Sequence, residues 1–87
     1  MIVVNSRFLT QPITGVQRFS IELSLQLKKK LGSQVLFVSP SNILHHDLAE
    51  ILEVKVIGRR TGHAWEQFDL PLFLNQMGKP LLLCMGN

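Results

Sequence analysis

Short apolar runs separated by stretches of helical periodicity are the feature that most constrains the fold. The first run, at 2–4, is continuous and rich in β-branched residues, which is typical of a strand buried on both faces. Similar runs at 34–38, 54–57 and 81–84 predict further strands. Strands that alternate with helices and short loops indicate a parallel sheet. The sequence therefore predicts one Rossmann-like α/β domain over 1–87, with a sheet of about four strands.

The first helix is predicted between Thr14 and Gly32. Thr14 has the spacing of a capping box with Gln17, and Gly32 supplies a stop. At about 100° per residue, one apolar stripe is expected to pack on the sheet. Its members are Val16, Phe19, Leu23, Leu27 and Leu31.

The later part of the chain predicts two more helical segments. The first covers 44–53, and the second covers 62–78, where Pro71 should kink or split the helix because it has no N–H to donate. Trp65 and Phe68 are expected to pack on the sheet. Cys84, the single cysteine, excludes an internal disulfide and is expected to be inert packing at the end of the last strand.

Composition narrows the classes of function. With 46% hydrophobic and 17% charged residues, the chain should fold rather than remain disordered. No apolar run approaches the roughly 18 residues of a membrane span, and the start at Met1 has no secretory pattern, so a cytoplasmic chain is expected. The net charge of +3 comes from dispersed residues, with 28–30 closing a helix and 59–60 in a loop, so no nucleic-acid partner is expected.

Two places at the carboxyl ends of the predicted strands are candidate ligand sites, because such folds bind ligands there. Main-chain N–H groups at Thr14, Gly15 and Val16 would face the ligand, and Arg18 would add a contact to a phosphate or a sugar hydroxyl. His63 would act as a hydrogen-bond donor or general base. The alternative is that Thr14 only caps, Gly15 only turns and His63 is structural.

Several common sites are disfavoured. The chain has neither a Gly-x-Gly-x-x-Gly pattern nor a Walker lysine, which argues against dinucleotide binding and nucleotide hydrolysis. Adjacent helical residues at 45–47 point about 100° apart and cannot share one tetrahedral metal, so no metal site is expected.

Ile21 and Leu25 form a second apolar pair, expected roughly opposite the main stripe of the first helix. The chain also ends on a strand without a following helix. Either these residues are ordinary exposed apolar side chains, or a further segment or a second copy of the chain covers them. The second case predicts a homodimer.

Two segments carry a resemblance to a known family. They are 4–19, VNSRFLTQPITGVQRF, and 62–67, GHAWEQ, followed by Leu70 and Pro71. Together they closely resemble bacterial retaining glycosyltransferases of the two-Rossmann-domain type, often labelled group 1 glycosyltransferases or mannosyltransferases. The resemblance runs over essentially the whole chain.

The resemblance implies transfer of a sugar from a nucleotide-sugar donor to a glycan acceptor in surface polysaccharide synthesis, without a metal or other cofactor. Thr14, Gly15 and Val16 would face the donor phosphates and the acceptor, Arg18 would lie at their margin, and His63 would line the cleft. The donor-binding domain of that family is not among these residues, so the isolated chain is expected to be inactive. Two other hypotheses are a non-catalytic, self-associating α/β module and a small phosphate-ligand site at Gly15.

Overall fold

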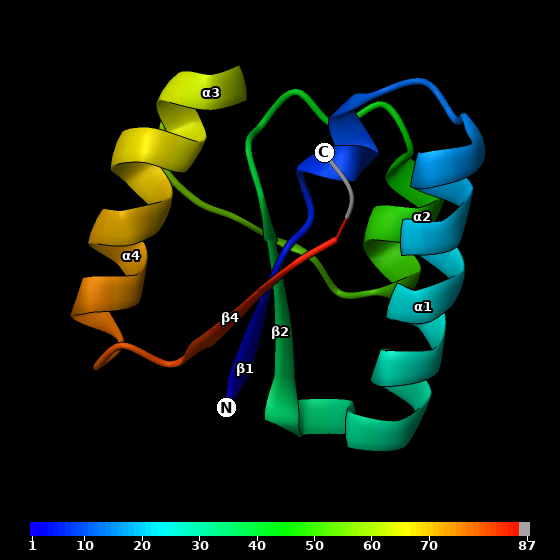
Figure 1. Cartoon of the computed structure of the whole chain (residues 1–87), viewed down its shortest axis with the longest axis horizontal. Coiled ribbons are helices and arrows are strands. Elements are labelled where there is room, and N and C mark those ends of the chain that lie inside the picture. The colour runs from blue at the N-terminus through cyan, green and yellow to red at the C-terminus, as the bar shows by residue number, and fades with distance from the viewer. Residues whose placement is uncertain (86–87) are drawn as a thin grey trace.

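Residues 1–85 form a four-stranded, all-parallel sheet with helices on both faces (Figure 1). The computed structural model describes residues 1–85. The strands follow the order β3-β2-β1-β4 across the sheet. Their bounds are β1 Ile2–Asn5, β2 Val35–Ser39, β3 Lys55–Val56 and β4 Leu81–Cys84. The Rossmann-like α/β fold predicted from the sequence is confirmed, with strand boundaries within two residues of those expected.

Helices α1 (Gly15–Leu31) and α2 (His46–Ile51) cover one face of the sheet (Figure 1). The other face carries one helical stretch, made of α3 (Gly62–Ala64), the π-helix η3 (Trp65–Asp69) and α4 (Leu70–Gln76). Two short 3-10 helices, η1 (Arg7–Thr10) and η2 (Gly32–Gln34), join β1 to α1 and α1 to β2. The helices therefore form the outer layers of a three-layer sandwich.

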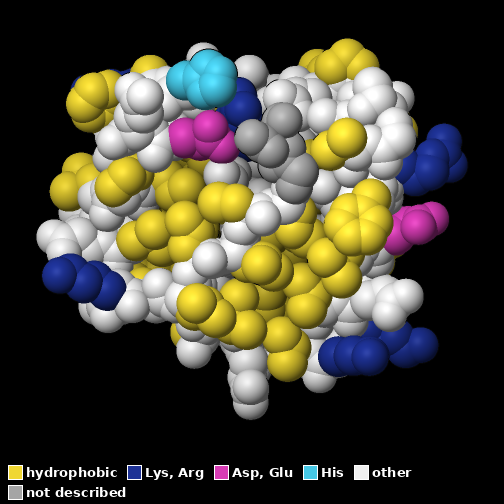
Figure 2. All heavy atoms as spheres, viewed as in Figure 1, with side chains coloured by type: hydrophobic (Ala, Val, Ile, Leu, Met, Phe, Trp, Pro, Cys, Tyr) yellow, Lys and Arg dark blue, Asp and Glu magenta, His cyan; other side chains and the backbone are white. Residues whose placement is uncertain are grey.

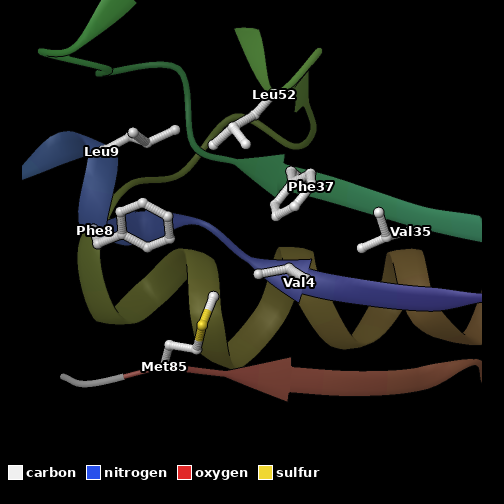
Figure 3. Close-up of a cluster of buried hydrophobic side chains, with 7 residues drawn as sticks. All are labelled: Val4, Phe8, Leu9, Val35, Phe37, Leu52 and Met85. Carbon is white, nitrogen blue, oxygen red and sulfur yellow. The ribbon is translucent and has the colours of Figure 1, made fainter. Parts of the chain in front are cut away.

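Two apolar clusters hold these layers together, one on each face. Because side chains alternate along a strand, Val3 and Val4 of β1 enter different clusters. Figure 3 shows the cluster on the α1 face, where side chains from β1, η1, β2, α2 and the end of β4 converge. Its buried members are Val4, Phe8, Leu9, Val35, Phe37, Leu52 and Met85. The α4 face buries Val3, Val38, Ile57, Trp65 and Leu70.

The inward face of α1 differs from the predicted stripe. Its first members, Val16 and Phe19, are 50% and 61% exposed, whereas Ser20 and Ser24 are fully buried. Small serine side chains let the helix approach the sheet closely, and the apolar residues on both flanks pack around them. Those flanking residues are Ile21, Leu23, Leu25, Leu27 and Leu31, all partly buried. Ile21 and Leu25 therefore do not lie opposite the buried face, and their expected exposure is wrong.

The ends of α1 lie where the sequence placed them. Thr14 is the extended N-cap residue, and Gly32 ends the helix with a φ of 53°. The reciprocal capping bonds are not formed, however, because the Thr14 hydroxyl pairs with the Gln17 side-chain oxygen instead of a main-chain N–H.

Pro71 does not interrupt the third crossover, which is one continuous helical stretch, but it lies where the π-helix passes into α-helix. It lies at the first turn of α4, after the wider turns of η3. The Leu70 N–H still bonds to the Trp65 carbonyl in the π-helical pattern, and Pro71 follows in the first turn of α4, where a missing N–H is tolerated. Trp65 is fully buried and donates its Nε1–H to the Ile57 carbonyl at 2.9 Å. Phe68 does not pack on the sheet: it is 58% exposed and lies 5.2 Å from the Arg60 guanidinium.

Within residues 1–85, no helix is both long and apolar enough to cross a membrane.

Candidate functional site

A cavity of about 440 Å³ opens at the carboxyl end of the sheet, beside β1 and β4. The chain leaves β1 toward β2 on one side and returns to β4 on the other, so this is the topological switch point of the sheet, where such folds bind ligands. The volume lies within the range of about 300–1,000 Å³ usual for ligand pockets. Its lining is Asn5, Arg7, Phe8, Gln11, Val16, Gln17, Ser20, Glu66, Leu70, Leu82, Cys84 and Met85.

Asn5, the last residue of β1, organises the floor of the cavity. It is 7% exposed, and its Nδ2 donates to Glu66 Oε2 at 2.8 Å and lies 3.7 Å from Cys84 Sγ. Its Oδ1 accepts the main-chain N–H of Arg7 at 3.1 Å, which turns the chain into η1. One amide therefore links the ends of β1 and β4 to the π-helix on the α4 face.

Glu66 is the acidic centre of the site. Besides the bond from Asn5, its Oε2 lies 3.2 Å from Arg7 Nε and forms an ion pair with it. Its other oxygen, Oε1, lies 3.8 Å from His63 Nδ1, beyond hydrogen-bond distance. The side chains of Arg7 and Glu66 are only 15% and 27% exposed, so this ion pair is screened by water far less than a surface pair. Near the upper edge of the molecule, Figure 2 shows a histidine beside acidic and basic side chains.

The start of α1 forms the opposite wall with amides and a hydroxyl. Gln17 Nε2 donates to Gln11 Oε1 at 2.8 Å. The Ser20 hydroxyl lies 3.2 Å from both the Val16 and the Met85 carbonyls, which ties α1 to the segment after β4. The side chains of Gln11, Gln17 and Ser20 therefore give this wall both hydrogen-bond donors and acceptors.

The residues predicted for the site do not all line this cavity. Val16 lines the cavity, whereas Thr14, Gly15 and Arg18 are exposed and lie outside its lining. The side chain of His63 is 85% exposed and also lies outside the lining, but it faces Glu66 at the rim. Of the five predicted positions, Val16 alone is in the lining, and His63 lies beside the lining residue Glu66. Met85, directly after β4, is buried and lines the cavity, and Gly86 and Asn87 lie outside the described residues.

Cys84 is exposed and lines the cavity, so the expectation of inert packing is wrong. As the last residue of the edge strand β4, it lies opposite Asn5 in the β1–β4 register, with no further strand beyond it among the described residues. Sequence reasoning also gave no role to Asn5, Arg7 and Glu66. The available signal was the position of a polar residue directly after a buried strand, at the edge where ligands bind.

No group of three or more possible metal ligands occurs within residues 1–85. Comparison with family models, with curated proteins and with solved structures found no match for this chain.

Proposed function

We propose that this chain forms the acceptor-side part of a glycosyltransferase that moves a sugar from a nucleotide-sugar donor to a saccharide or lipid-linked acceptor in surface polysaccharide synthesis. The observation that carries the proposal is the contact between the two segments that resemble the family. Asn5 and Glu66 are 61 positions apart, yet they hydrogen bond at 2.8 Å inside a polar cavity at the switch point. Residues from both segments thus build one site.

The chemistry of the lining suits a sugar. Carboxylate, guanidinium, amide and hydroxyl groups can pair with the many hydroxyls of a saccharide. Apolar side chains such as Leu70 and Leu82 can pack against the C–H face of its ring. The proposal assigns this cavity to the acceptor.

The donor phosphates belong at the start of α1 in this proposal. Departure of a nucleoside diphosphate builds negative charge, which free N–H groups at a helix N-terminus stabilise. Gly15 and Val16 are exposed there, with Thr14 before them, and Arg18 lies one turn further on the same helix. His63 at the rim would contact ligand where donor and acceptor meet. A second domain would supply the remaining donor contacts, with the parent protein in the cytoplasm, peripheral to the inner membrane.

The test begins with the genomic DNA downstream of the Asn87 codon. We expect an in-frame second β/α domain, and we expect the longer protein to release nucleoside diphosphate from a nucleotide sugar only when an acceptor is present. Glu66→Gln should lower this acceptor-dependent release, whereas Glu22→Gln, an exposed change on α1 outside the cavity, should leave it unaltered. Efficient sugar transfer by the 87 residues alone would refute the proposal.

A second proposal is self-association through the edge of β4. Within the described residues β4 pairs only with β1, and Leu81 is 68% exposed. Leu82 and Leu83 pack on opposite faces of the sheet and both remain partly exposed. Figure 2 shows apolar side chains gathered over the face where β4 runs in Figure 1. Exposed edges and apolar patches favour pairing, so sedimentation should show a homodimer that Leu81→Lys weakens; a strict monomer at high concentration would contradict this.

A further inference from the structure

We infer that the Arg7–Glu66 ion pair makes the cavity selective for an uncharged saccharide unit over acidic, phosphorylated or amino sugars. This inference depends on the proposed function, because it specifies the substrate class of the same cavity. Arg7 and Glu66 are the only ionisable Arg, Lys, Asp, Glu or His side chains in the described lining. Their charges are opposite and lie 3.2 Å apart, so together they give the cavity no net formal charge.

The pair also has the hydrogen-bonding pattern that neighbouring sugar hydroxyls require. A guanidinium can only donate, and a carboxylate can only accept. Arg7 Nε is the nitrogen that lies 3.2 Å from Glu66 Oε2, and the two terminal nitrogens of Arg7 have no hydrogen-bond partner within residues 1–85. Glu66 Oε1 likewise accepts no hydrogen bond from those residues. A hydroxyl can accept from Arg7 and another can donate to Glu66, so a diol satisfies both groups without adding charge.

A charged sugar would meet one attractive and one repulsive charge in the cavity. A carboxylate or phosphate near Arg7 would also face Glu66, and an ammonium near Glu66 would also face Arg7. Because both side chains are largely buried, the repulsive contact would not be fully screened by water.

The N-terminus of α1 is the competing effect, since its partial positive charge attracts anions. That partial charge is screened by water, because the residues at the helix start, Thr14, Gly15 and Val16, are exposed. The side chains of Arg7 and Glu66 are less exposed than these residues and are screened less. Inside the cavity the ion pair therefore has the larger electrostatic effect on a ligand, and anions should bind only at the exposed start of α1.

The test is a set of amide chemical-shift titrations of the ¹⁵N-labelled 87-residue chain. The probes are the neutral methyl glycosides, the uronates and the amino sugars of glucose, galactose and mannose, with inorganic phosphate as a separate probe. For the wild type, we expect a neutral sugar to shift the cavity residues with an affinity at least about fivefold above that of its charged forms. Phosphate should shift the amides at the start of α1, at 15–17, and leave those of Asn5, Arg7 and Glu66 unshifted.

The charge variants make the experiment specific. Glu66→Gln leaves Arg7 unbalanced and should move the preference toward uronates by about tenfold. Arg7→Gln should move it toward amino sugars by a similar factor, and the double variant should restore the preference for neutral sugars. Glu22→Gln, the same chemical change outside the cavity, should behave as the wild type. If either single variant unfolds, the other single variant still measures the shift in preference.

The outcomes separate this inference from the proposed function. Equal or tighter binding of a uronate by the wild type in the cavity would overturn the neutral selectivity but keep the saccharide site. A wild-type cavity that responds to none of the sugars would overturn both. Unchanged preferences in the charge variants would show that the pair does not select.

Discussion

The contact between Asn5 and Glu66 should be measurable as a coupling free energy in a double-mutant cycle. Asn5→Ala removes a 2.8 Å hydrogen bond to a carboxylate and a 3.1 Å bond from the Arg7 N–H. Bonds to charged groups contribute about 1.5–3 kcal/mol and neutral ones about 1 kcal/mol. Glu66 keeps Arg7 as a partner and is 27% exposed, so water recovers part of this loss. We expect Asn5→Ala to lower the free energy of unfolding by about 2–3 kcal/mol.

The coupling itself, from urea denaturation of wild type, Asn5→Ala, Glu66→Ala and the double variant, should be about 1–1.5 kcal/mol. The control is a cycle on Lys28 and Glu53, whose ion pair has the same 3.2 Å separation as Arg7–Glu66 but with Glu53 76% exposed. That coupling should be about 0.5 kcal/mol or less. An Asn5–Glu66 coupling as small as the control value would refute the account of the cavity floor.

Two further predictions concern the free energy of unfolding. Gly58→Ala should lower it by at least about 2 kcal/mol, because Gly58 has a φ of 70° and a Cβ there would lie 2.5 Å from Asp69 Cβ. The matched change Gly78→Ala, at a φ of 81° with nothing within 4 Å, should cost only about 1 kcal/mol; equal losses would contradict the steric argument. Ser24→Ala should raise the free energy by about 1 kcal/mol, because the buried Ser24 Oγ has no partner among the described residues. Ser20→Ala should lower it by about 1 kcal/mol, since that hydroxyl lies within bonding distance of two carbonyls, and a loss from Ser24→Ala would count against the assigned packing.

The sheet could be predicted because its strands are short, continuous and apolar, and because Gly32 and Pro71 mark where helices end or change. The packing of α1 could not be predicted so well. Hydrophobic periodicity centres a buried face on large apolar residues, whereas close approach to the sheet here favours Ser20 and Ser24. Phe68 was misplaced because the π-helix alters the angular spacing that an α-helical pattern assumes.

The edge of the sheet that carries the cavity could be predicted from the α/β order, but its central residues could not. The partners Asn5 and Glu66 lie on different elements, and no local spacing relates them. The position of Cys84 at the end of an apolar strand indicates packing, but β4 lies at an edge of the sheet and leaves Cys84 exposed. The sequence favours His63 because it lies at a predicted helix start beyond the third strand, yet it is Glu66, in the next turn of that helical stretch, that lines the cavity.

The decisive experiment is a crystal structure of the chain soaked with a neutral saccharide. We expect the sugar between Glu66, Arg7 and Gln17, with hydroxyls within hydrogen-bond distance of Glu66 Oε1 and the terminal nitrogens of Arg7. An empty cavity with the sugar bound elsewhere, such as along β3, would contradict it.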